Sequence, residues 1–134
     1  MNEKKVLLIT EDEVSLRKVL RDSLQGEGFS VLEAVNGADG LQVALEKHPH
    51  LILLDILMPT LSGIEVLKKL RESGEWGKKV SVIFLTNLSP DDERINRIVT
   101  DYEPAYYLLK SNVSLSEIVE KVKESLASNA EGTP

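Results

Sequence analysis

Apolar residues along this chain follow two alternating patterns. Short β-branched or leucine-rich runs that end at polar residues predict strands, and longer stretches with apolar positions every three or four residues predict amphipathic helices. A predicted helix follows each predicted strand. The predicted strands are residues 5–10, 29–35, 51–54, 80–85 and 105–109.

The predicted helices carry recognisable N-terminal signals. Short polar side chains favour the N-cap because they accept hydrogen bonds from the first backbone amides, and a Glu three residues later completes a capping box. The predicted N-caps are Asn36, Ser62, Ser89 and Ser114, with Pro90 at the first position of the fourth helix and Glu65 and Glu117 completing boxes. Core-facing positions are expected at Val14, Leu16, Val19, Leu20 and Leu24 in the first helix and at Leu41, Ala44 and Leu45 in the second, with Arg17 outside.

Strands alternating with helices of this length predict a parallel sheet with helices on both faces, because each crossover returns right-handed to the sheet. Residues 51–54 (LILL) are apolar throughout, as in a strand buried on both faces, whereas residues 29–35 alternate, as at an edge. The expected fold is α/β and flavodoxin-like, a doubly wound (βα)5 parallel five-stranded sheet of order 2-1-3-4-5. We expect one domain over residues 1–128 and a flexible tail over 129–134.

Composition narrows the function classes. The chain has 134 residues, no cysteine and a net charge of −6, so neither disulfides nor thiol chemistry is available. No basic cluster is present to neutralise phosphates, which argues against direct nucleic-acid binding. The longest apolar runs are too short to cross a bilayer and no secretory apolar core follows residues 2–5 (NEKK). The expected location is cytoplasmic, without membrane attachment.

Charged and polar residues stand directly after four of the predicted strands. Glu11 and Asp12 follow the first strand, Asp55 the third, Thr86 the fourth and Lys110 the fifth. The carboxyl ends of parallel strands share one edge, and in the order 2-1-3-4-5 the first and third strands are neighbours at the switch point, where such folds bind ligands. These five side chains are therefore expected around one pocket.

Three carboxylates in one pocket disfavour full ionisation unless a cation lies among them, and an all-oxygen acidic cluster suits Mg²⁺. Mg²⁺, the Lys110 ammonium and the Thr86 hydroxyl together suit the oxygens of a phosphoryl group while Asp55 attacks in line. The expected product is an aspartyl phosphate.

At these residues the chain resembles the response-regulator receiver domain of two-component systems, of the CheY-like single-domain type. The matching pieces are residues 8–13 (LITEDE), residues 54–59 (LDILMP) with Ser62-Gly63 behind them, Thr86, and residues 107–110 (YLLK). The resemblance covers the chain up to about Leu126.

The resemblance implies a phosphoprotein that takes a phosphoryl group from a sensor histidine kinase or a histidine phosphotransfer protein. Asp55 would be the phosphoacceptor, and the fourth helix, fifth strand and fifth helix would form the face read by a downstream protein target. It further implies metal ligands Glu11, Asp12, Asp55 and the Leu57 carbonyl for Mg²⁺, phosphoryl contacts from Thr86 and Lys110, and switch residues Thr86 and Tyr107, with Tyr107 swinging inward on activation.

Two departures from the family pattern affect this expectation. Ser111 stands where the family usually has a Pro after the lysine, which puts the aim of Lys110 in question, and residues 104–105 (PA) replace the usual Gly-Ala pair. The resemblance also implies that the residues two places after the phosphoacceptor and two places after Thr86 lie beside the path of the hydrolytic water; here they are Leu57 and Leu88. Because neither side chain can hydrogen-bond water, slow autodephosphorylation is expected.

Two alternative functions fit less well. A small Mg²⁺-dependent phosphatase with an aspartyl nucleophile would carry a second Asp at position 57, where this chain has Leu57. A flavodoxin-like cofactor binder would need a Ser/Thr/Gly-rich phosphate loop after the first strand, and none is there. His48 and His50 form a possible metal pair but are interpreted as a solvated turn, and Trp76, in a predicted loop, is either a partner contact or a cover for the third helix.

Overall fold

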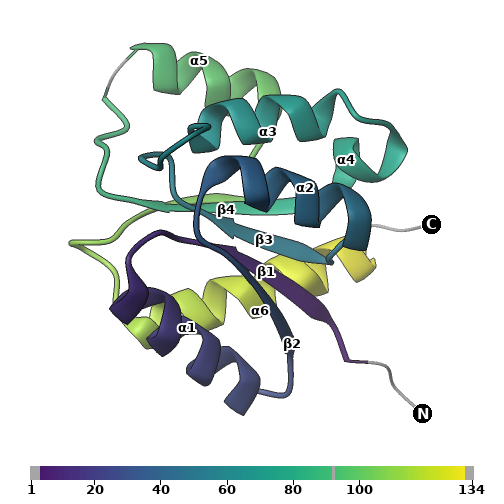
Figure 1. Ribbon diagram of the computed structural model, residues 1–134, viewed down its shortest axis with the longest axis vertical. Coiled ribbons are helices and arrows are strands. Elements are labelled where there is room, and N and C mark those ends of the chain that lie inside the picture. Colours follow the sequence, from purple (N-terminus) through teal and green to yellow (C-terminus); the bar gives the residue numbers. More distant parts are fainter. Residues whose placement is uncertain (1–3, 92, 132–134) are drawn as a thin grey trace.

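The computed structural model describes residues 4–91 and 93–131 of the chain. Strands and helices alternate through these residues as the sequence predicts, with one short helix added (Figure 1). Their bounds are β1 Val6–Thr10, α1 Val14–Gly26, β2 Ser30–Ala34, α2 Gly37–Lys47, β3 Leu51–Leu54, α3 Gly63–Arg71, α4 Glu75–Lys79, β4 Ser81–Thr86, α5 Glu93–Tyr102, β5 Tyr106–Leu109 and α6 Leu115–Glu131.

The five strands form one parallel sheet of order β2-β1-β3-β4-β5, which confirms the predicted flavodoxin-like fold. In the register of β1 with β3, Thr10 pairs with Leu54, and in that of β4 with β5, Thr86 pairs with Leu109. The residues that follow these strands therefore leave the sheet at the same edge. This register positions the candidate site.

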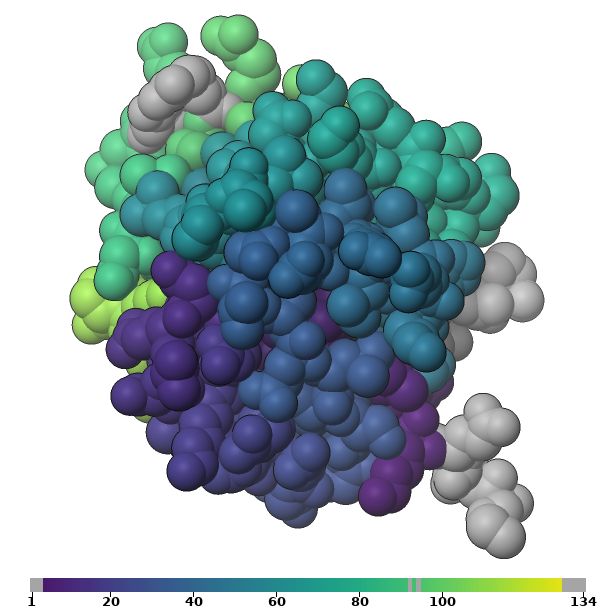
Figure 2. All heavy atoms as spheres, viewed as in Figure 1, coloured from purple at the N-terminus to yellow at the C-terminus, as the bar shows by residue number. Residues whose placement is uncertain are grey.

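Alternating strand residues divide the core into two layers, one on each face of the sheet. Leu8, Ile52 and Phe84 pack beneath α2, α3 and α5, whereas Leu7, Leu53 and Leu85 pack against α1 and α6. In Figure 2, α2 and α3 lie side by side above α1 and β2; α2 contacts α3, and α3 contacts α5. Both faces of the central strands are buried, as a continuous apolar run predicts. No helix in the described part of the chain is both long and apolar enough to cross a membrane.

Several predicted boundaries were wrong. Residues 75–79, predicted as a loop, form the short helix α4. The fourth predicted helix begins at Glu93 and not after Ser89, whose hydroxyl instead accepts a hydrogen bond from the Asp91 amide in a turn; residue 92 lies outside the described residues. The tail predicted for residues 129–134 is helical as far as Glu131, and residues 132–134 lie outside the described residues.

Three predicted core positions are exposed. The side chains of Val14, Val19 and Leu45 are 66%, 48% and 42% exposed, because each lies at the margin of its helix face, while Leu20, Leu24 and Ala44 fill the interior. Arg17, predicted to point outward, is largely buried. The predicted caps at Asn36, Ser62 and Ser114 are confirmed, since each accepts from an amide of the first turn.

Arg71, the last residue of α3, ties together the end of the molecule opposite the candidate site. Its guanidinium donates to four backbone carbonyls: those of Gly77 and Val80 at 2.8 Å, Tyr102 at 2.8 Å and Glu103 at 3.2 Å. One side chain thus fixes α4, the start of β4 and the C-terminal end of α5. Because a guanidinium presents five donors in a rigid fork, no other side chain could donate to all four carbonyls.

We expect Arg71→Met to lower the free energy of unfolding by about 3 kcal/mol, because four carbonyls lose a charged donor. Lys69→Met, on the exposed face of the same helix, is the matched control and should change it by less than about 0.5 kcal/mol. Urea denaturation measures both values. Equal stabilities for the two variants would show that water replaces the guanidinium without cost.

Candidate functional site

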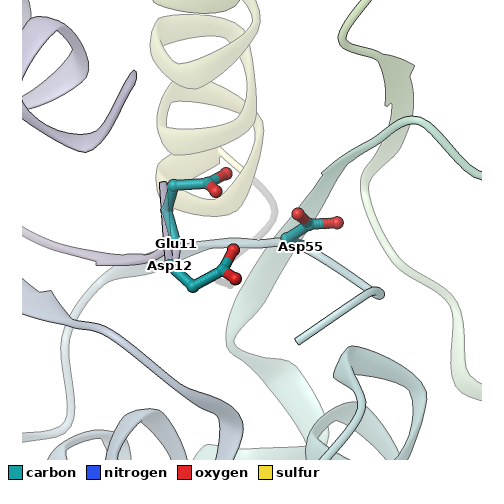
Figure 3. Close-up of side chains that lie close together, drawn as sticks. All are labelled: Glu11, Asp12 and Asp55. Carbon is teal, nitrogen blue, oxygen red and sulfur yellow. The ribbon is translucent and has the colours of Figure 1, made fainter. Parts of the chain in front are cut away.

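Three carboxylates meet at the edge where β1 and β3 end. Glu11 and Asp12 follow β1, Asp55 follows β3, and one carboxylate oxygen from each lies within 4.8 Å of the others. Figure 3 shows the three side chains converging on the space between the two strand ends. Glu11 and Asp55 are buried and Asp12 is exposed, so the cluster opens to solvent on one side.

Lys110, directly after β5, reaches across β4 into this cluster. Its Nζ lies 2.8 Å from Asp55 Oδ2 and 2.8 Å from Glu11 Oε1. Its backbone amide donates to Thr86 O at 2.9 Å, which continues the β4–β5 ladder to the site. Cis peptide bonds are absent from residues 4–91 and 93–131, so Ser111 follows Lys110 through a trans bond. The lysine points into the pocket although Ser111 replaces the family's proline.

Burial and charge act in opposite directions on these groups. Burial raises the pKa of Glu11, and the hydrogen bonds from Lys110 and the Glu13 amide oppose this shift. Burial acts to lower the pKa of Lys110, but its hydrogen bonds to Asp55 and Glu11 outweigh this effect, so its pKa is raised. Lys110 therefore stays cationic and compensates part of the negative charge.

Backbone amides fix the orientation of two of the carboxylates. The Leu57 amide donates to Asp55 Oδ1 at 3.1 Å, and the Glu13 amide donates to Glu11 Oε2 at 3.0 Å. Both are turns in which a side chain accepts from the amide two residues ahead. These two contacts were not predicted from the sequence, although an acidic residue at a strand end is the signal for such a turn. The other oxygen of each carboxylate is held by Lys110.

Thr86 and Tyr107 are joined through Leu88. The Leu88 amide donates to Thr86 Oγ1 at 3.3 Å, and the Tyr107 hydroxyl donates to Leu88 O at 2.6 Å. The Tyr107 ring packs edge-on against Phe84 with the ring centroids 5.8 Å apart. Burial raises the pKa of the Tyr107 hydroxyl, and the negative charge of Asp55 adds to the shift. In this structure Tyr107 faces inward; its movement on activation stays a prediction.

The donor set fits a hard divalent cation. Three carboxylates supply oxygen ligands only, and the exposed side of the cluster at Asp12 leaves positions for water or a phosphoryl oxygen, the coordination that Mg²⁺ prefers. The Leu57 side chain is 56% exposed beside the pocket. An ammonium held at hydrogen-bond distance from the carboxylate that would react adds a second positive charge. The arrangement is suited to binding and transferring phosphoryl groups.

Arg17 also belongs to the surroundings of the site, although it was predicted only to point outward. Its Nη1 donates to Glu11 O at 2.9 Å. No local pattern signals these contacts, because the second partner of Arg17 is Glu33 in β2, which is distant in the sequence.

The histidines and Trp76 lie elsewhere. The His48 ring stacks on Trp76 with centroids 4.2 Å apart, and Trp76 Nε1 donates to Pro49 O at 3.3 Å. His50 Nδ1 accepts from the Val6 amide. Both histidines are exposed in the loop between α2 and β3, as the solvated-turn interpretation predicts. In addition, His48 and Trp76 hold α4 against this loop, at the end of the sheet opposite the carboxylates.

The chain is a doubly wound α/β domain with an acidic cluster and a lysine at the switch point of its sheet. The family model of the response regulator receiver domain matches residues 7–123, and this chain belongs to that family. Receiver domains are the signalling switches of two-component systems. They interact with histidine kinases and with downstream effectors. The resemblance inferred from sequence is confirmed.

Curated relatives are longer than this chain. The uncharacterized transcriptional regulatory protein YkoG of Bacillus subtilis is 34% identical over 131 residues, which cover 98% of this chain and 55% of YkoG. The transcriptional regulatory protein DltR of Streptococcus agalactiae is 40% identical over 90 residues, 67% of this chain and 39% of DltR. The chain thus spans about half or less of the length of the curated relatives that it matches.

Solved structures agree with the fold. The CheY-like receiver domain protein from Methanospirillum hungatei has a TM-score of 0.87 at 23% identity, covering 96% of this chain and 98% of its own. The response regulator TrrA from Thermotoga maritima, solved in complex with Mg²⁺-BeF, has a TM-score of 0.76 at 31% identity, covering 90% of this chain and 98% of its own.

Gly63 permits the close approach of α3 to the Asp55 backbone. A Cβ at this position would lie 2.2 Å from Asp55 O and 2.8 Å from Ile56 Cα. We expect Gly63→Ala to lower the free energy of unfolding by about 1 to 3 kcal/mol through overpacking. Gly26→Ala, at the last residue of α1 where a Cβ would meet nothing within 4 Å, is the control and should stabilise by up to about 1 kcal/mol. Denaturant titration measures the free energy of unfolding of both variants. A Gly63→Ala protein as stable as the wild type would disprove the clash.

Proposed function

We propose that this chain is a signalling switch that is phosphorylated on Asp55. The phosphoryl group would come from a sensor histidine kinase or a histidine phosphotransfer protein. The observation that carries the proposal is the convergence of Glu11, Asp12, Asp55 and Lys110 on one pocket, with Lys110 Nζ 2.8 Å from Asp55 Oδ2. The proposed location is cytoplasmic, where such phosphoryl donors act.

The proposed Mg²⁺ ligands are the carboxylates of Glu11, Asp12 and Asp55 and the Leu57 carbonyl. When bound, Mg²⁺ supplies positive charge that stabilises the charge developing on the transferred phosphoryl oxygens. The relative TrrA, solved with Mg²⁺ and beryllofluoride, supports this choice of ion.

In the transfer step, one Asp55 carboxylate oxygen attacks the phosphorus of a phosphohistidine. A phosphorus–oxygen bond forms as the phosphorus–nitrogen bond breaks, and the departing imidazole nitrogen keeps the electron pair. The Leu57 amide, 3.1 Å from Asp55 Oδ1, orients the carboxylate. The Lys110 ammonium and the Thr86 hydroxyl then donate to phosphoryl oxygens.

The proposed output face is formed by α5, β5 and α6, with Thr86 and Tyr107 as switch residues. A Thr86 hydroxyl drawn toward the phosphoryl group acts on Leu88, because the Leu88 amide bonds to Thr86 and the Leu88 carbonyl to Tyr107. Binding of a downstream protein to this face would select one arrangement of that loop. The chain itself is proposed to make no direct nucleic-acid contact and no membrane attachment.

Catalytic turnover of phosphate esters is not supported. The alternative phosphatase needs an acid/base group two residues after its nucleophile, and the Leu57 side chain offers none. Asp55 is instead expected to accept one phosphoryl group and to lose it slowly.

Incubation with acetyl phosphate and Mg²⁺, followed by intact mass measurement, tests the acceptor. We expect one phosphoryl group per chain on the wild type and none on Asp55→Asn, because the amide is not a nucleophile. Asp22→Asn removes an exposed carboxylate from α1 and should be modified like the wild type. An adduct that persists in Asp55→Asn, or release of phosphate so fast that no stoichiometric adduct accumulates with excess donor, would contradict the proposal.

The lifetime of the phosphorylated state depends on access of water to the phosphorus. Leu57 and Leu88 flank the proposed approach, the first largely exposed and the second partly buried against the core. Neither side chain can orient a water molecule or accept its proton. Slow autodephosphorylation is therefore proposed.

We expect Leu57→Asn and Leu88→Glu each to speed phosphoryl loss on the order of tenfold, since an orienting polar group or a general base is restored. Leu45→Asn, an exposed leucine on α2, should leave the rate unchanged. Phosphoryl loss is followed by mass under identical Mg²⁺. Unchanged rates in both site variants would mean that the leucines do not control access.

A further inference from the structure

Arg17 connects the backbone of a proposed metal ligand to the edge strand. Its Nη1 donates to Glu11 O at 2.9 Å, and its Nε donates to Glu33 Oε1, in β2, at 3.2 Å. The side chain is 14% exposed, although α1 lies at the surface. Such an arginine is held at two points and has little freedom to move.

The Glu11 peptide is consequently held from both sides. Its amide donates to Ala34 O at 3.1 Å, next to Glu33, while its carbonyl accepts from Arg17. In the part of the chain that the structure describes, the carboxylate paired with Arg17 is that of Glu33, and the Glu11 carboxylate bonds to Lys110 and to the Glu13 amide. Arg17 therefore orders the turn that carries Glu11 and Asp12 through its backbone, and it does not occupy the carboxylate oxygens that would bind the metal ion.

We propose that Arg17 is a positioning residue for the divalent-cation site, and that Glu33 holds its guanidinium on the backbone and away from the site's carboxylates. This inference rests on the proposed function, in which Glu11 and Asp12 bind Mg²⁺. With Arg17 in place, the turn that carries both ligands is ordered before the ion arrives. Without it, ion binding must also order the turn, and the affinity falls.

Electrostatics alone makes the opposite prediction. Deleting a cation beside three carboxylates makes the pocket more negative, so Coulomb attraction would bind Mg²⁺ more tightly. Loss of an outer contact that orients a metal ligand typically costs about tenfold or more in affinity. The direction of the change therefore separates a positioning role from a charge effect.

Arg21 offers a matched control. It lies one turn further along α1 and also pairs with Glu33, with Nη1 3.5 Å from Oε2, and its other ion pair is with Asp22. Arg21→Met removes the same charge from the same helix and the same glutamate partner. It leaves the contact between Arg17 and Glu11 O in place.

The experiment titrates the full chain with Mg²⁺ alone and follows backbone amide shifts by NMR, with urea denaturation to confirm that each variant is folded. We expect Arg17→Met to weaken Mg²⁺ binding about tenfold, and Arg21→Met to leave it unchanged or slightly tighter. Arg17→Lys keeps the charge but not the fork that reaches both acceptors, so it should also bind more weakly than the wild type. This second variant carries the test if Arg17→Met does not fold.

Three results would overturn the inference. Arg17→Met and Arg17→Lys binding Mg²⁺ as tightly as the wild type, or more tightly, would leave only a charge effect. An equal loss in Arg17→Met and Arg21→Met would assign the effect to the helix as a whole. A wild type that binds no Mg²⁺ would refute the proposed metal site, and the positioning role with it, whereas the first two results leave the metal site standing.

Discussion

The structure depends on the placement of the Lys110 ammonium between the buried carboxylates of Glu11 and Asp55. Glu11 and Asp55 are buried at the ends of neighbouring strands, and like charges this close oppose folding unless they are compensated. Lys110 bonds to both, but it comes from β5, two strands away from β3. The charge balance therefore requires the order and register of β1, β3, β4 and β5 together. A displacement of β5 would break both ion pairs at once, so the site and the sheet are energetically coupled.

The loops around the site are held unequally. The loop after Asp55 is packed onto the N-terminal end of α2: Thr60, with a positive φ of 69°, accepts from the Ala38 amide and donates to Asn36. Gly37 lies so close that a Cβ would meet Leu61 O. Much of the loop after Thr86, in contrast, is held by single side-chain hydrogen bonds at Leu88 and Ser89. In the described residues, the first loop is thus held by close backbone packing onto α2, and the second by side-chain hydrogen bonds at Leu88 and Ser89.

Much of this arrangement could be predicted from sequence because its causes are local. Continuous apolar runs identify buried strands, and the chemistry stands at their ends, so Glu11, Asp12, Asp55, Thr86 and Lys110 could be placed at one edge once the order of the strands was inferred. The failures have tertiary causes. Residues 75–79 form a helix because Trp76 packs on His48 and Arg71 binds the Gly77 carbonyl, and neither contact is visible in the local pattern. The cap signals at Ser89 were overridden, so the helix starts at Glu93. Arginine is usually a surface residue, so Arg17 was expected to point outward. It is held beside the site only because β2 brings Glu33 next to it.

The two ends of α5 differ in how firmly they are held, and this difference gives the fold a direction in which it can respond. At the C-terminal end, Arg71 bonds to the carbonyls of Tyr102 and Glu103. At the N-terminal end the chain enters from Leu88, whose amide and carbonyl are bonded to Thr86 and Tyr107. Both of these contacts are single hydrogen bonds, each worth about 1 kcal/mol net, whereas the Arg71 contacts are charge-assisted and multiple. Under the proposed function, a rearrangement that begins at Thr86 would reach α5 through Leu88, while the Arg71 contacts hold the C-terminal end of the helix in place.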